Sequence, residues 1–250
     1  MAPLAGLANV TAVAIQNARL HQTTAEALDG TAGVVGKAIE ARDPYTSGHQ
    51  QRVAQLATAI ANEMSLSADQ AEGLRIAAML HDIGKISIPA ETLSRPGKLS
   101  TVEYRLIQAH PQTGYDLLEA VPFPQPVAEI VLQHHERLDG SGYPRGLSAP
   151  ELLLEARILA VSDVVEAMAS HRPYRPALGI EVALAEIEKN KGTLYDAAAV
   201  EACLAVFRAG FHFEPGSEAA AIPASPILRC ESIPNGRPVL GRRGMAISTL

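Results

Sequence analysis

The sequence predicts an all-α protein, from its composition and from the spacing of its apolar residues. Hydrophobic residues make up 47% of the 250 residues, but aromatic residues only 4%, and Trp is absent. A core must therefore be built mainly from Ala, Leu, Ile and Val, of which Ala and Leu favour helices. Apolar positions recur at three- or four-residue steps, and no stretch shows a convincing strand-like alternation. We expect a helical bundle.

The first predicted helix runs from Leu4 to about Ala41 and is rich in Ala. One face carries Leu7, Val10, Ala14, Asn17 and Leu20. This face carries too few apolar residues for the helix to be stable by itself, so we expect the helix to pack against a second copy of the chain or an upstream domain. Gly30, Gly33 and Gly36 should weaken the helix locally.

The remaining helices are predicted, in order, at 48–64, 68–82, 100–110, 112–120, 125–136, 150–170, 179–190 and 196–209. Ser67 suits an N-cap, the Ser100-to-Glu103 segment reads as a capping box, and Pro150 suits a first helical turn. Segments rich in Pro or Gly predict loops at 86–99, 137–149 and 171–178.

Composition also limits the classes of function. The net charge of −6 argues against binding of a nucleic-acid polymer, although a few basic residues could still hold a nucleotide. No apolar run approaches a membrane span, and the start of the chain lacks the pattern of a secretory signal. Cys203 and Cys230 have neither metal-type nor disulfide-type spacing. We therefore expect a cytoplasmic location and no membrane partner.

The strongest local motif is His81-Asp82-Ile83-Gly84-Lys85, which follows an apolar helical segment. This position predicts that His81 and Asp82 are buried, where an unpaired carboxylate is costly. A structural His–Asp hydrogen bond is one explanation, and a divalent transition metal is a better one. Gly84 should end the helix and turn Lys85 back toward the same place, where an ammonium would suit a phosphate.

His134 and His135 pose a second question, because they are adjacent. Neighbouring residues on a helix point about 100° apart, so they could reach two adjacent metal ions better than one. Two such ions can hold a phosphoryl group and activate water. The alternative is a solvated helix end, against which the apolar residues before His134 argue.

These motifs together resemble the HD-GYP branch of the HD phosphohydrolases. The resemblance rests on ARDPYTSGH at 41–49, HDIGK at 81–85, His110-Pro111 and HHERLDGSGYP at 134–144, in that order. It covers roughly residues 32–210 and implies an all-helical HD domain. It also implies hydrolysis of cyclic di-GMP to pGpG, with further cleavage to GMP open, using two or three ions, often iron or manganese.

The resemblance implies a role for each matching residue. His49, His81, Asp82 and Asp163 would hold one ion, and His110, His134 and His135 a second, with Asp82 bridging both. Asp82 and Lys85 would act in catalysis, and Lys85 would contact phosphate or the attacking water. Arg172 and Arg175 in the RPYRP segment would bind substrate, as would the turn of Gly142 and Tyr143. The alternative for the two arginines is a solvated surface loop.

Two positions depart from the family pattern. Tyr45 stands where relatives with three metals have a Glu ligand, which favours a two-metal site. Glu166 stands where the family often has Asp, so the charge is kept and the reach changes.

The resemblance also divides the chain. Residues 1–31 are similar to the last helix of GAF sensor domains, residues 32–210 would be the catalytic domain, and residues 211–250 have the low complexity of a disordered tail. A homodimer through the N-terminal helix and GGDEF-type signalling proteins are the expected partners. Two other functions stay open: an HD-type hydrolase of another nucleotide or cyclic dinucleotide, and a non-catalytic signalling module.

Overall fold

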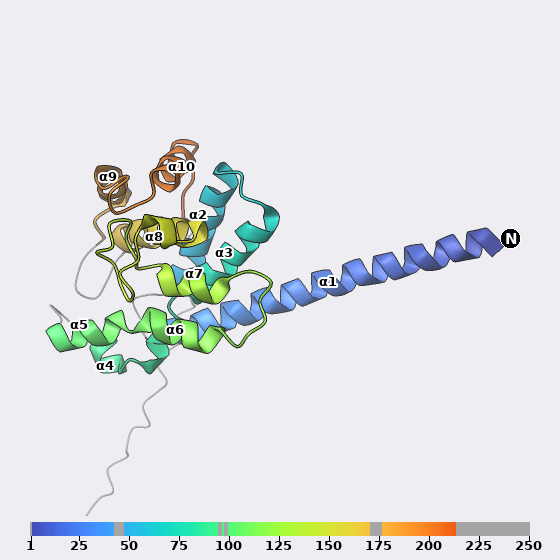
Figure 1. Ribbon diagram of the computed structural model, residues 1–250, viewed down its shortest axis with the longest axis horizontal. Coiled ribbons are helices and arrows are strands. Elements are labelled where there is room, and N and C mark those ends of the chain that lie inside the picture. Colours follow the sequence, from blue (N-terminus) through green and yellow to red (C-terminus); the bar gives the residue numbers. More distant parts are fainter. Residues whose placement is uncertain (1, 43–47, 95–96, 98–99, 171–176, 214–250) are drawn as a thin grey trace, which may run out of the picture. The chain divides into compact units, whose positions relative to one another are not determined.

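The computed structural model describes residues 2–42, 48–94, 97, 100–170 and 177–213. Within them the regular elements are helices and no strand is present, which confirms the all-α prediction. The α-helices are α1 (Ala2–Glu40), α2 (His49–Glu63), α3 (Ala68–Leu80), α4 (Ala90–Leu93), α5 (Thr101–Gln108), α6 (His110–Leu118), α7 (Val127–Gln133), α8 (Leu154–Ala169), α9 (Ile180–Lys189) and α10 (Ala197–Arg208) (Figure 1). Two short 3-10 helices are η1 (Ile83–Ser87) and η2 (Ala149–Glu151).

The core forms where α2 and α8 meet the other helices. Helix α2 packs against α3, α8 and α10, and α7 packs against α3, α6 and α8. Fully buried side chains from these helices include Leu56, Ile60, Leu74, Ile130, Ile158 and Leu159. The apolar faces of several helices are thereby buried together, which supplies the main stabilising free energy of such a bundle.

The helix starts follow the predicted capping signals. Ser67 and Ser100 each form a capping box, with Gln70 and Glu103 respectively. Pro150 does not start the long helix as predicted: it lies in η2, and α8 begins four residues later at Leu154.

Helix α1 runs through all three glycines, of which Gly33 and Gly36 lie close to Met79 of α3, and the local weakening expected there stays a prediction. Two further predictions on the elements need correction. The loop predicted at 86–99 contains the short helix α4. Helix α7 ends at Gln133, so the two adjacent histidines lie just beyond it.

The C-terminal end of α1 belongs to the bundle. Ala32 and Ile39 are buried, and this helix contacts α3 and η1. Residues 11–20 are instead exposed along their whole length, including Val13, Ile15 and Leu20. No helix in the described ranges is long and apolar enough to cross a bilayer.

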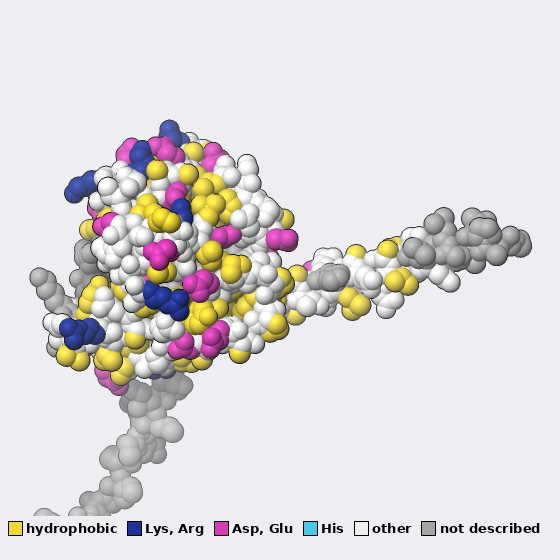
Figure 2. Space-filling model, viewed as in Figure 1, with side chains coloured by type: hydrophobic (Ala, Val, Ile, Leu, Met, Phe, Trp, Pro, Cys, Tyr) yellow, Lys and Arg dark blue, Asp and Glu magenta, His cyan; other side chains and the backbone are white. Residues whose placement is uncertain are grey.

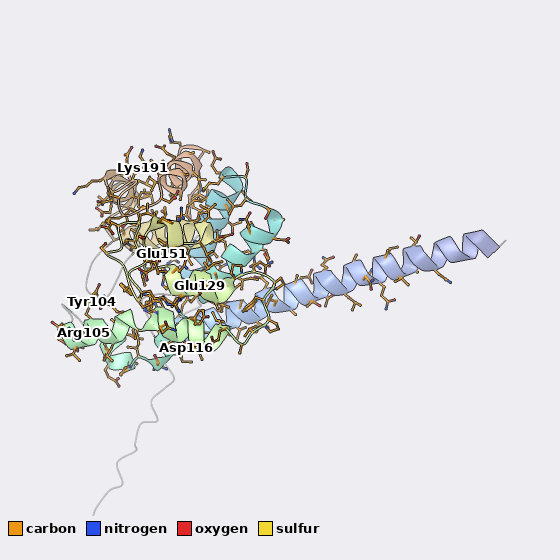
Figure 3. The ribbon with its side chains drawn as sticks, viewed as in Figure 1. Tyr104, Arg105, Asp116, Glu129, Glu151 and Lys191 are labelled. Atoms are coloured by element: carbon orange, nitrogen blue, oxygen red, sulfur yellow. The ribbon has the colours of Figure 1, made fainter. Side chains whose placement is uncertain are left out.

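The surface carries apolar and charged side chains side by side. On the face shown in Figure 2, the Lys and Arg side chains are scattered rather than gathered into one basic patch. Helix α5 buries none of its residues, and Tyr104 and Arg105 lie exposed on it (Figure 3). Past α10, the rings of Phe211 and Phe213 contact Phe207. The predicted tail beyond Phe213 lies outside the described residues.

Candidate metal centre

The fold brings together all seven residues that the sequence analysis assigned to metal ions. They come from the start of α2 (His49), the segment after α3 (His81 and Asp82), the start of α6 (His110), the segment after α7 (His134 and His135) and the middle of α8 (Asp163). Six are buried and His135 is half-buried. Three sets have ligand atoms within 4.8 Å of one another: His110, His134 and His135; His49, His81 and Asp163; and His81, Asp82 and His134.

Local backbone contacts orient three of the imidazoles. Nδ1 of His81, His110 and His134 lies 2.7, 2.7 and 2.5 Å from the carbonyl oxygens of Ala78, Ile107 and Val131, each three residues earlier. A carbonyl oxygen can only accept, so each Nδ1 donates its hydrogen. In the neutral imidazole, Nε2 then carries a lone pair, which is the form that binds a metal.

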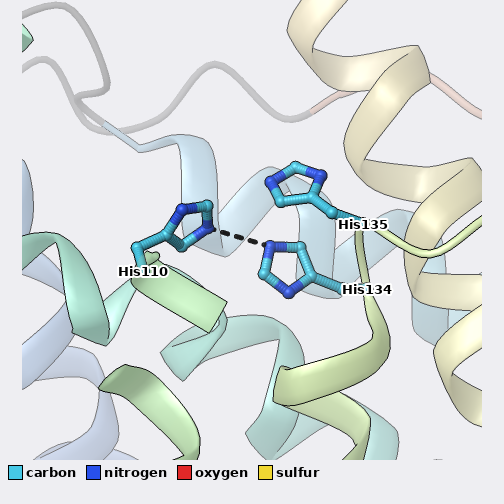
Figure 4. A group of neighbouring side chains, drawn as sticks. All are labelled: His110, His134 and His135. Carbon is cyan, nitrogen blue, oxygen red and sulfur yellow. Dashed lines mark hydrogen bonds between the residues drawn. The ribbon is translucent and has the colours of Figure 1, made fainter. Parts of the chain in front are cut away.

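Two of these lone pairs face each other. Nε2 of His110 lies 3.3 Å from Nε2 of His134. Figure 4 marks this contact with a dashed line. Burial lowers the pKa of His110 to about 4 and that of His134 well below its usual value, so both rings are neutral near pH 7. Two neutral acceptors at this distance repel each other, and a cation between them removes the repulsion. The donors therefore fit a divalent transition metal.

Asp82 lies between the two groups of ligands. Its Oδ1 is 3.4 Å from Nε2 of His110, and its Oδ2 is 3.6 Å from Nε2 of His81. On the other side, Nε2 of His49 lies 3.3 Å from Oδ1 of Asp163. One carboxylate oxygen of Asp82 thus faces each group, which is the arrangement that bridging requires; the bridge itself stays a prediction.

Lys85 turns back toward the centre, as expected. Its Nζ lies 2.6 Å from Oδ2 of Asp82. Burial raises the pKa of Asp82, but Lys85 and then the surrounding imidazoles outweigh burial and hold it well below its usual range. Asp82 is therefore a carboxylate, the form that a metal binds.

The reason for Gly84 differs from the predicted one. It does not end α3, which stops at Leu80, but lies within η1. A Cβ at Gly84 would fall 1.9 Å from the carbonyl oxygen of His110. Only Gly permits this approach, so Gly84 fixes the separation between the HD motif and His110.

Comparison with known proteins identifies the family of the chain. The family model described as "HD domain" matches residues 33–199, about two thirds of the chain. The chain belongs to the HD domain family.

Curated relatives that match this chain are longer than it is. A cyclic di-GMP phosphodiesterase response regulator, RpfG, from Xanthomonas campestris pv. campestris is 44% identical over 172 residues, covering 68% of this chain and 46% of the relative. A 3'3'-cGAMP-specific phosphodiesterase from Vibrio cholerae is 43% identical over 162 residues, covering 64% and 35%. This chain thus spans less than half the length of these relatives.

A solved structure supports the fold. Bd1817, an HDG"Y"P protein from Bdellovibrio bacteriovorus, has a TM-score of 0.57 with 17% sequence identity. The likeness covers 74% of this chain and 64% of that protein. At this identity it bears on the fold alone, and it agrees with an all-helical HD domain.

Contrary to the prediction from the sequence, His134 and His135 do not lie within a helix. They follow α7 in a turn, and their ring centroids lie 4.0 Å apart with planes tilted by 40°. His134 has no exposed surface, which excludes a solvated helix end. The ring of His135 also packs 4.7 Å from that of Tyr143, so the predicted substrate turn lies directly against a candidate ligand.

The turn after these histidines is held by a residue that the sequence analysis did not assign. Glu136 is buried and accepts hydrogen bonds from the backbone N–H groups of Arg145, Gly146 and Leu147, at 2.7, 3.1 and 3.1 Å. Gly142 packs against the backbone of Glu136, where a Cβ would lie 2.4 Å from Cα. The absence of a side chain at Gly142 therefore allows the turn to close. The predicted contact of Gly142 with substrate stays a prediction.

Glu166, which stands where the family often has Asp, contacts the candidate ligand His49. It is fully buried, and its carboxylate accepts a hydrogen bond from Nδ1 of His49, with further donors in Arg52 and Ser170. Burial raises the pKa of Glu166, but His49, Ser170 and Arg52 outweigh it and lower the pKa to about 2. The predicted residues Tyr45, Arg172 and Arg175 lie outside the described residues.

Proposed function

We propose that the chain is a metal-dependent phosphodiesterase that hydrolyses cyclic di-GMP to pGpG and can cleave pGpG further to GMP. The observation that carries this proposal is the facing pair of neutral Nε2 atoms of His110 and His134, 3.3 Å apart on two fully buried rings. The relatives named for cyclic di-GMP hydrolysis, at 44% identity, support this choice of substrate.

The cofactor we propose is a pair of divalent transition-metal ions, iron or manganese. Imidazole nitrogens with carboxylate oxygens suit such ions. His49, His81 and Asp163 would hold one ion, His110, His134 and His135 the other, and Asp82 would contact both. When bound, the pair supplies Lewis acidity at phosphorus and a nucleophile at neutral pH.

The chain's own residues would orient the phosphodiester. The Lys85 side chain, 17% exposed, lies at the edge of the centre, where its ammonium can offset negative charge on a phosphoryl oxygen. Tyr143 presents a half-buried ring beside His135, on which a base or ribose can pack. Arg172 and Arg175 would add forked donors to phosphate or guanine edges.

Turnover with the metal content known tests the proposal. The protein is purified anaerobically, its metals are measured, and cyclic di-GMP is followed to pGpG and GMP by chromatography. Asp82→Ala should abolish turnover and remove most of the metal, since this residue faces both groups of ligands. Wild-type protein fully loaded with iron or manganese that shows no turnover would favour a non-catalytic signalling module instead.

A second candidate substrate is 3'3'-cGAMP. The relative named for that substrate is 43% identical, nearly the same as the 44% of the cyclic di-GMP relatives. The two dinucleotides differ in one base and share the phosphodiesters that the centre would bind. Measuring kcat/KM for both on one preparation decides between them: a higher value for 3'3'-cGAMP would replace the first proposal.

We also propose a homodimer through α1 and GGDEF-type signalling proteins as partners, in the cytoplasm. Val13, Ile15 and Leu20 of α1 are 57, 50 and 59% exposed, and pairing with a second copy would bury them. Light scattering over a range of concentrations tests the dimer. A monomer at every concentration would contradict it.

A further inference from the structure

His49 is oriented differently from the other inward-facing histidines. His81, His110 and His134 donate Nδ1–H to backbone carbonyls, whereas Nδ1 of His49 pairs with the carboxylate of Glu166. A carboxylate is the stronger acceptor, because it carries a full negative charge. A histidine held in this way is a more basic ligand through Nε2, and its ring is locked in one orientation.

Glu166 is itself held in place from three directions. Its Oε1 accepts hydrogen bonds from Nε of Arg52 at 2.7 Å and from Oγ of Ser170 at 2.6 Å, while Oε2 pairs with His49. With no exposed surface, the carboxylate has no water to compete for these donors. Its position relative to His49 is therefore fixed before any ion arrives.

The backbone of His49 is fixed as well. Glu40, at the end of α1, accepts hydrogen bonds from the backbone N–H of Gly48 at 2.9 Å and of Gln50 at 3.3 Å. These bonds satisfy free donors at the start of α2, on either side of His49. Both the ring and the main chain of this ligand are preorganised.

The two groups of ligands also differ in charge. The Asp163 subsite, made of His49, His81 and Asp163, contains a carboxylate and the imidazole backed by Glu166. The three-histidine subsite, made of His110, His134 and His135, contains imidazoles alone. Asp82 presents one oxygen to each subsite, and the charge of its Oδ2, on the side of the Asp163 subsite, is offset by Lys85, which leaves Asp163 as the carboxylate that distinguishes the two. A divalent cation is attracted more strongly to the subsite with more negative charge.

We infer that the two subsites load in sequence, the Asp163 subsite first and more tightly, and that Glu166 is the positioning residue that sets this order through His49. The inference rests on the metal binding of the proposed function, but it concerns affinity rather than turnover. Loss of such a carboxylate behind a metal-binding histidine typically costs 10- to 100-fold in affinity, roughly the effect expected here.

The experiment titrates the metal-free full chain with Mn²⁺ and follows free Mn²⁺ by electron paramagnetic resonance. Wild-type protein should show two unequal binding constants. Glu166→Gln should weaken the tighter one about 10- to 100-fold and leave the weaker one within about threefold. Glu166→Asp keeps the charge and should recover part of the loss, which a purely structural role would not predict.

Glu155→Gln is the matched control. Glu155 is a buried carboxylate on the same helix, and it pairs with Gln70 rather than with a candidate ligand. This variant should keep both binding constants. Two equal constants in the wild type, or an unchanged tight constant in Glu166→Gln, would overturn the inference while leaving the proposed function intact. Absence of any Mn²⁺ binding by the wild type would overturn both.

Discussion

At the scale of single residues, the buried histidines make the stability of the metal-free HD domain depend on pH. Burial lowers the pKa of His110 to about 4, from 6.5, and lowers those of His134 and His135 in the same direction. The unfolded chain takes up protons below about pH 6.5, whereas the folded chain does not. The stabilising contribution is therefore complete above pH 6.5 and is lost as the pH falls toward 4.

This loss can be measured by urea unfolding of metal-free protein between pH 7.5 and 5. Each histidine kept neutral in the folded state adds a slope of at most about 1.4 kcal/mol per pH unit. His110→Gln should reduce the slope, and the same change at the exposed His212 should not. Equal slopes for wild type and His110→Gln would show that burial does not control this imidazole.

The sequence singled out the candidate ligands more readily than the residues that orient them. The seven candidate ligands carry a recognisable spacing, and the fold brings all of them together. The role of Glu166 could not be predicted from a local motif, because its partners His49 and Arg52 lie 117 and 114 residues away in the sequence. Glu136 lies within the motif HHERLDGSGYP, but its backbone partners depend on how the following turn closes. Long-range contacts of this kind are fixed only by the tertiary structure.

At the scale of elements, the contact between η1 and α6 controls how the HD motif faces His110. Gly84→Ala would place a Cβ 1.9 Å from the carbonyl oxygen of His110 and force the two helices apart. We expect a loss of stability of about 3 kcal/mol or more, because backbone must move, and a sharp fall in metal content.

Gly30→Ala is the matched control for this substitution. Gly30 lies within α1 with no atom in reach of an added Cβ. There the change should be neutral or stabilise by up to about 1 kcal/mol, through helix propensity. Thermal unfolding and metal analysis compare the two variants, and normal metal content in Gly84→Ala would contradict the role assigned to this contact.

The short elements that the sequence does not predict share one physical cause. The long helices have several turns of apolar periodicity and were predicted to within a few residues at most ends. Helix α4 has four residues and η1 five, too few for a period to be visible, and α4 lies between prolines that suggested a loop. The end of α7 at Gln133 has another cause, since no helix-stopping residue stands between the apolar segment that ends at Leu132 and the histidines.

At the scale of the whole molecule, α1 has two parts that should respond differently to truncation. Residues 22–27 are exposed like residues 11–20, whereas Leu28 packs against the core and Ala32 and Ile39 are buried in it. A chain beginning at Leu28 should therefore keep its metal content and its monomer stability. It should lose only the stabilisation that dimerisation through the residues before Leu28 would confer. That stabilisation grows with protein concentration.

A chain beginning at Arg42 tests the other part of α1. It lacks Ala32 and Ile39, which make apolar contacts with the bundle. It also lacks Glu40, whose carboxylate accepts a hydrogen bond from the backbone N–H of Gly48 at the start of α2. Burial of Ile39 alone is worth about 2 kcal/mol, and an unsatisfied helix start adds roughly 1 kcal/mol. We expect a lower unfolding temperature and weaker metal binding, since His49 stands on that helix start. Equal stability and metal affinity in the two truncated chains would show that the end of α1 does not support the metal centre, and that the domain begins at α2.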